Sequence, residues 1–188
     1  MKKVFVLLLV TVATMANAYA ASEKTDAELV AGMNVASYDV SSANSRIGFH
    51  TGVRVNFGLP NVQQGLYANG AILLSLRGAK VADYNFNPFY LDIPIHLGYR
   101  YRVTSDVALI GEFGPYFGIG LFGSTDGLDV FSDEFGLKRF DVGLGLRVGA
   151  EFNNKITTSL GYDFGLIEVA DDTKAKNRNF YISLGYKF

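Results

Sequence analysis

The two histidines of this sequence are the side chains best suited to acid–base chemistry near neutral pH. His50 follows Ser41, Ser42 and Ser45 in the chain. A histidine can activate a serine hydroxyl as a nucleophile when a third group orients the ring. No spacing around His50 or His96 identifies such a group. A histidine that is hydrogen-bonded inside the fold is therefore the simpler interpretation, and a hydrolase site at His50 is the alternative.

Acidic residues gather in the segment 122–138, at Asp126, Asp129, Asp133 and Glu134. Ca²⁺ takes about six to eight oxygen ligands, so clustered carboxylates can bind it. The spacing differs from that of an EF-hand, and the glycines of the segment favour a flexible, solvated loop. Cysteine is absent, which excludes disulfides and cysteine-based metal or redox sites. We therefore expect no metal site and no cofactor.

Apolar and polar residues alternate along most of the chain. In the segment 140–152 the even-numbered residues are all apolar, and the odd-numbered ones are glycine or charged. A strand places such residues on opposite faces, whereas a helix would mix them. The same separation predicts eight strands, at about 28–36, 47–57, 66–77, 90–101, 107–121, 139–152, 155–167 and 179–188.

One face of these strands carries no charge, and the other carries five acids and seven bases. The acids are Asp92, Glu112, Asp141, Glu151 and Asp163, and the bases are Arg54, Arg77, Arg100, Arg139, Arg147, Lys155 and Lys187. His50 and His96 share this face. An isolated buried charge is very costly, so we expect the charges to form a salt-bridged network, with Asp92, Arg100 and Glu112 near its centre. A path for protons or ions is the alternative.

The nature of the two faces favours a membrane barrel. The uncharged face is bulky and continuous, whereas the charged face is rich in glycine, which leaves room for long side chains in a narrow lumen. A lipid-facing wall around a polar interior is typical of outer-membrane barrels, whereas a soluble lipocalin-like barrel would have the opposite facing. We therefore expect an all-β fold, an eight-stranded antiparallel up-and-down transmembrane β-barrel.

The amino terminus has the pattern of a secretory signal peptide. Lys2 and Lys3 precede an apolar run at 4–12, and small residues near 16–20 offer cleavage after position 18 or 20. We expect a signal peptide at 1–20 and the barrel at 21–188, with an uncleaved anchor as the alternative. The long connections at 37–46, 78–89, 122–138 and 168–178 alternate with short ones. Short periplasmic turns would then place both termini in the periplasm.

Composition limits the function. The hydrophobic fraction of 49% excludes a disordered chain, and the net charge of −1 argues against nucleic-acid binding by a basic surface. Cleavage would remove two lysines and leave 15 basic against 18 acidic residues, a charge of −3.

The last strand and one internal segment carry a family resemblance. Tyr186 and Phe188 end an alternating aromatic strand that is similar to the carboxy-terminal signal read by the outer-membrane assembly machinery. The segment 90–95, Tyr-Leu-Asp-Ile-Pro-Ile, resembles the Tyr-Leu-Glu-Ile-Pro stretch of Bacteroidetes barrels called PorT-like or porin-family proteins, with Asp92 where Glu is more common. Gly114-Pro115-Tyr116 and Asp141-Val142-Gly143 fit the same pattern. The resemblance implies an eight-stranded barrel of the OmpX/OmpA type, in the outer membrane.

These observations predict a monomeric, non-enzymatic barrel with a plugged lumen. Its partners would be outer-membrane lipid and, during biogenesis, the assembly machinery. Its four long loops would give it a structural or surface-interaction role. A lipid-modifying enzyme of the lipid A hydrolase type and a narrow diffusion channel are the alternatives.

Overall fold

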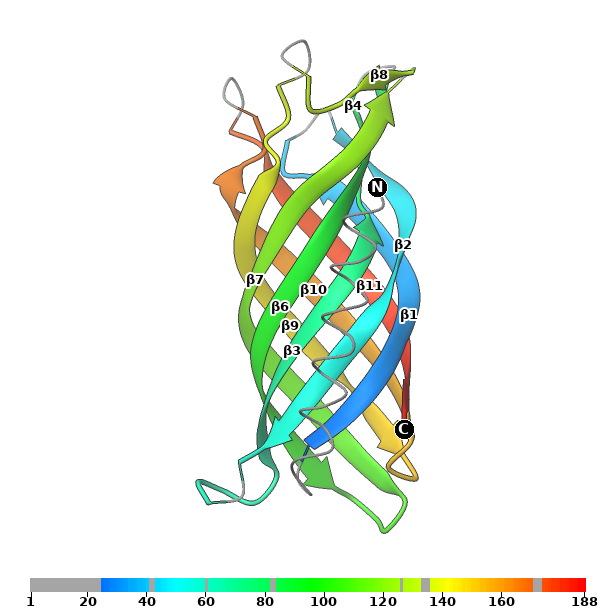
Figure 1. Ribbon diagram of the computed structural model, residues 1–188, viewed down its shortest axis with the longest axis vertical. Helices are drawn as coiled ribbons and strands as arrows, with labels where there is room; N and C mark the ends of the chain where they lie inside the picture. The colour runs from blue at the N-terminus through cyan, green and yellow to red at the C-terminus, as the bar shows by residue number, and fades with distance from the viewer. Residues whose placement is uncertain are drawn as a thin grey trace.

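The alternation of apolar and polar residues produces eight long antiparallel strands that close into a barrel in the computed structural model (Figure 1). The structure describes residues 25–40, 43–59, 61–81, 84–125, 127–132, 136–170 and 174–188. The long strands are β1 (Thr25–Tyr38), β2 (Ala43–Gly58), β3 (Leu66–Leu76), β6 (Asn87–Arg102), β7 (Val107–Thr125), β9 (Phe140–Phe152), β10 (Ile156–Glu168) and β11 (Lys176–Lys187). The eight-stranded antiparallel barrel predicted from the sequence is confirmed.

Each long strand pairs with its neighbours in the sequence, and the first and last strands close the barrel. β1 pairs with β2 on one side and with β11 on the other. The β1–β11 register runs from Glu28 opposite Lys187 to Tyr38 opposite Asn177. The seam is therefore a full-length ladder, and neither of these strands is left with an open edge.

The two ends of the barrel differ. The short-turn end, at the bottom of Figure 1, holds the connections 59–65, 103–106 and 153–155. The opposite loop end holds the longer connections and three short strands, β4 (Ala79–Val81), β5 (Tyr84–Asn85) and β8 (Leu128–Asp129). β4 pairs with β2 and β5, and β8 pairs with the end of β7. The expected loops 78–89 and 122–138 thus contain short strands, which the sequence analysis missed.

The barrel wall is apolar on the outside. Large hydrophobic side chains along the strands are exposed, among them Met33, Ile95, Phe113, Leu146 and Leu184. The opposite phase of each strand is buried inside the barrel and is mostly polar or glycine. No helix within the described ranges is long and apolar enough to cross a membrane.

An apolar cluster lies at the loop end. The buried side chains of Tyr38, Ala79, Val130, Leu137 and Val169 pack together there, with Ala175. They come from β1, β4 and the connections around β9 and β11, so distant parts of the chain meet above the barrel. We call this cluster the apolar cap.

Some sequence predictions lie outside the described residues. These are the signal peptide at 1–20, the loop serines Ser41 and Ser42, and three members of the acidic group, Asp126, Asp133 and Glu134. Of that acidic group, the structure describes Asp129, which is exposed.

Candidate functional site in the barrel lumen

Charged side chains from seven of the eight long strands meet inside the barrel, together with Arg77, which follows β3 directly. They form three groups along the barrel axis, because each strand contributes charges at different heights. We call them the short-turn cluster (Asp26, Arg100, Glu151, Lys187), the middle cluster (Glu28, Arg54, Glu112, Arg147) and the loop-side cluster (Arg77, Asp92, Asp141, Asp163).

The short-turn cluster is a closed ring of two acids and two bases. Lys187 Nζ lies 2.6 Å from Glu151 Oε2 and 3.2 Å from Asp26 Oδ1. Arg100 Nη2 lies 3.1 Å from the same Glu151 oxygen and 3.5 Å from Asp26 Oδ2. Asn56 also donates to Asp26, at 2.6 Å. Every charge therefore has two opposite partners.

The middle cluster is the most deeply buried. Arg147 donates to both oxygens of Glu112, with Nε 2.6 Å from Oε2, and its Nη1 donates to Ser159 at 3.2 Å. The Tyr67 hydroxyl donates to Glu112 at 2.6 Å. Such a two-pronged arginine–carboxylate contact is stronger than a single hydrogen bond.

The second ion pair of the middle cluster joins β1 and β2. Arg54 Nη1 lies 3.3 Å from Glu28 Oε2, and Thr157 donates to the other oxygen of Glu28. The middle cluster therefore also holds two acids and two bases. The two ion pairs lie side by side as the most buried charges of the lumen.

The loop-side cluster has one base for three acids. Arg77 Nη2 lies 2.7 Å from Asp92 Oδ2 and 3.1 Å from Asp163 Oδ2, and its Nη1 lies 3.9 Å from Asp141. Polar neighbours support the acids, because Tyr116 and Asn177 each donate to Asp141 at 2.9 Å, and Asn179 donates to Asp163 at 3.0 Å.

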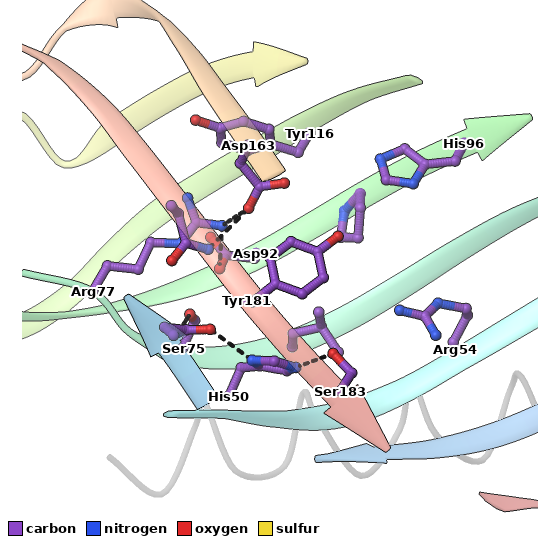
Figure 2. A pocket seen from close by; sticks show the side chains of 14 residues that line it. His50, Arg54, Ser75, Arg77, Asp92, His96, Tyr116, Asp163, Tyr181 and Ser183 are labelled. Carbon is purple, nitrogen blue, oxygen red and sulfur yellow. Dashed lines mark hydrogen bonds and ion pairs between the residues drawn. The ribbon is translucent and has the colours of Figure 1, made fainter. Parts of the chain in front are cut away.

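His50 lies at the centre of a three-residue chain. Its Nε2 lies 2.7 Å from Ser183 Oγ (Figure 2). Its Nδ1 lies 2.7 Å from Asn34 Oδ1. Asn34 in turn donates to Ser75 at 2.8 Å. The order amide–histidine–serine is that of a hydrolytic triad, yet Ser183 is only 3% exposed.

The structure differs from the sequence predictions at several residues. Arg139 and Lys155 are exposed at the two rims and not inside the barrel. Asp92, Arg100 and Glu112 do not share one centre, because each belongs to a different cluster. His50 faces Asn34 and Ser183, whereas Ser45 is exposed in β2.

The sequence analysis also missed Asp26 and Glu28, two acids of the lumen. Glu28 is the first residue of the predicted strand 28–36 and shares the even-numbered face with Asn34, and one further step along that face reaches Asp26. The lumen therefore holds seven acids and five bases among the described residues, the reverse of the expected five and seven.

One cavity of about 20 Å³ lies between the middle and loop-side clusters (Figure 2). Its lining includes His50, Asp92, His96, Asp163 and Asn179. A cavity of this volume is large enough for about one ordered water molecule. No group of three or more His, Cys, Asp or Glu side chains in the described part of the chain is arranged to hold a metal ion.

A comparison with models of protein families shows to which family this chain belongs. Residues 5–188 match the model of the outer membrane protein beta-barrel domain. The chain belongs to this family. It is therefore a small β-barrel protein of the bacterial outer membrane.

Solved structures support the fold. The chain is similar to Neisserial surface protein A (NspA), with 15% identity, coverage of 86% of this chain and 95% of that one, and a TM-score of 0.57. It is also similar to the outer membrane enzyme PagL (14% identity, 87% and 98% coverage, TM-score 0.52). OprG from Pseudomonas aeruginosa gives 11% identity, 88% and 96% coverage and a TM-score of 0.50. A search of curated proteins gave no match.

Proposed function

We propose that this barrel is a closed, non-catalytic outer-membrane protein that acts through its loop end, in a structural or surface-interaction role. The observation that carries the proposal is the set of three charged clusters inside the lumen, two of them fully paired, with a cavity of about 20 Å³ between the middle and loop-side clusters. An eight-stranded barrel is just wide enough for its interior to be filled by side chains. With the lumen closed, the loops are the surface left for contact with the surroundings.

Planar-bilayer recordings test the closed lumen. The purified barrel should show no large, steady conductance, because the ion pairs of the middle cluster close the path at mid-height. Arg147→Ala, which removes one side chain of that cluster, serves as a matched comparison and should raise the frequency of small openings. A stable opening of nanosiemens scale in the unmodified protein would overturn the proposal and favour a diffusion channel.

A deletion strain tests the role of the loops. We expect altered adhesion or altered envelope permeability and unchanged lipid A composition. Normal adhesion and permeability in that strain would contradict a structural or surface role.

A lipid-modifying enzyme is the second candidate, because one specific contact favours it. His50 lies between Asn34 and Ser183 in the order of a hydrolytic triad. The buried serine and the small cavity leave no room for an ester beside the hydroxyl, which is why we place the candidate second. Altered lipid A in the deletion strain that is not restored by a His50→Ala copy would support it.

The remaining parts of the proposal concern orientation and subgroup. We propose that both termini lie in the periplasm, since the three short connections share the end where β1 begins and β11 ends. The segment 90–95 supports membership in the PorT-like subgroup. We expect a monomer in contact with lipid, assembled through the machinery that recognises Tyr186 and Phe188, both exposed on the outer wall.

A further inference from the structure

The charges of the lumen are balanced in two clusters and unbalanced in the third. The short-turn cluster and the middle cluster each hold two acids and two bases. The loop-side cluster holds Asp92, Asp141 and Asp163 against Arg77 alone, an excess of two negative charges. These side chains are at most 8% exposed, so water does not screen the excess. Buried charges are normally paired or neutralised, so this cluster needs a bound proton or a further cation to balance it.

Unpartnered polar atoms lie at the same place. Asp92 Oδ1, Asn179 Oδ1 and His96 Nε2 have no hydrogen-bond partner, although each residue is at most 4% exposed. All three residues line the cavity of about 20 Å³ (Figure 2). Buried polar atoms are nearly always satisfied, by protein or by a bound species. The oxygen atoms among them are acceptors, so the missing species donates hydrogen bonds or carries positive charge.

Each arginine that lines the cavity already has an acidic partner, although Nε and Nη1 of Arg77 have no hydrogen-bond partner. Arg77 contacts Asp92 and Asp163, and Arg54 contacts Glu28. His96 Nδ1 faces Glu112 at 3.7 Å, which turns its Nε2 away from the middle cluster. None of these side chains satisfies the free oxygen of Asp92.

We propose that this cavity binds one monovalent cation of about the size of a water molecule, with ammonium as the best match. The cavity holds about one such species, and a tetrahedral ammonium donates to several acceptors at once. The free oxygens of Asp92 and Asn179 accept hydrogen bonds from it, and the unpartnered Nε2 of His96 belongs to the same cavity lining. A zinc site needs three or four protein ligands, and the described residues provide no group of three or more His, Cys, Asp or Glu side chains that could hold a metal ion.

The cation is enclosed from both sides. The ion pairs of the middle cluster lie towards the short-turn end, and Tyr90, Tyr116 and the apolar cap lie towards the loop end. The test supplies the cation from refolding onwards, so that its result does not depend on access to the cavity in the closed barrel.

The test compares thermal unfolding of the full barrel, refolded in detergent micelles with ammonium, potassium or choline chloride at equal ionic strength. Choline is too large for the cavity and serves as the reference. Ammonium should raise the unfolding temperature by a few degrees over choline, in a manner that saturates with concentration, because it binds the folded state alone. Potassium should give a smaller rise in the same direction.

Asp92→Asn is the test variant and Asp26→Asn is its matched control. The first removes a charge from the loop-side cluster and should weaken the apparent ammonium affinity at least tenfold. The second removes a charge from the short-turn cluster and should leave that affinity unchanged. If Asp92→Asn does not fold, anomalous diffraction from crystals grown with rubidium provides the second measurement, with a peak expected beside Asp92 and Asn179.

Three results would overturn the proposal. Equal unfolding temperatures in ammonium, potassium and choline would show that no cation binds. An unfolding temperature that depends on pH and not on the cation would show that a proton balances the cluster. Density for a water molecule in place of a rubidium peak would show that the cavity is only hydrated.

Discussion

Replacing Glu112 by glutamine removes the charge that holds Arg147 inside the barrel. Arg147 is 2% exposed and makes two of its three hydrogen bonds to Glu112. Removing one partner of a buried ion pair costs about 3–5 kcal/mol, because the other charge is left uncompensated. Arg147 keeps Ser159, and the amide oxygen of the new side chain can still accept from Tyr67. We therefore expect a loss near the lower limit, about 3 kcal/mol.

Urea unfolding in lipid vesicles measures this loss. The double variant Glu112→Gln, Arg147→Met should recover at least about 1 kcal/mol relative to the single variant, because it removes the buried, unpaired charge. Asp39→Asn is the control, since Asp39 lies 2.5 Å from Arg178 but more than half of its side chain is exposed. That change should cost about 0–1 kcal/mol. A cost below about 1 kcal/mol for Glu112→Gln would refute the reasoning that burial, and not contact distance, sets the strength of these pairs.

Three further changes test the wall, the packing of the lumen and the last strand. Ile95→Arg places a charge on the lipid-facing wall and should cost about 2–4 kcal/mol in vesicles, whereas Leu128→Arg in the loops should cost about 0–1 kcal/mol. Equal costs would show that the wall does not face lipid. Gly98→Ala should lower stability by about 1–3 kcal/mol, because its new carbon meets a buried tyrosine ring, whereas Gly111→Ala enters open space and should change little. Similar losses at both glycines would contradict the packing described for the lumen. Deleting Phe188 should lower outer-membrane abundance in cells much more than it lowers the urea midpoint of the refolded barrel, and normal abundance would exclude a targeting role.

The strands were predictable from the sequence because one physical rule governs them all. Side chains alternate across a strand, and lipid on one side and a polar lumen on the other impose opposite compositions on the two faces. The segment 139–152 was therefore placed within one residue of β9. The short strands β4, β5 and β8 could not be predicted, because a strand of two or three residues is too short to show an alternation of apolar and polar residues.

The partners inside the lumen were not predictable, because they depend on register between distant strands. His50 and Ser183 are 133 residues apart, and nothing local to either residue indicates their contact. Asp92 and Arg100 both lie on β6, but they are eight residues apart. That separation along the strand places them in different clusters. Alternation reveals which side chains enter the lumen, and strand tilt and stagger decide which of them meet.

The seam between β1 and β11 has a consequence for the order of folding. Every other pairing between long strands joins two strands that follow one another in the sequence. Those hairpins can therefore form locally, before the last strand is available. The seam joins Glu28 to Lys187 and must wait for the last strand, which makes it a slow, non-local step. Until then the lumen is an open, curved sheet, and its acids and bases stay in water. Closure of the seam removes that water from all three clusters together, so barrel closure and desolvation of the charges are one cooperative event.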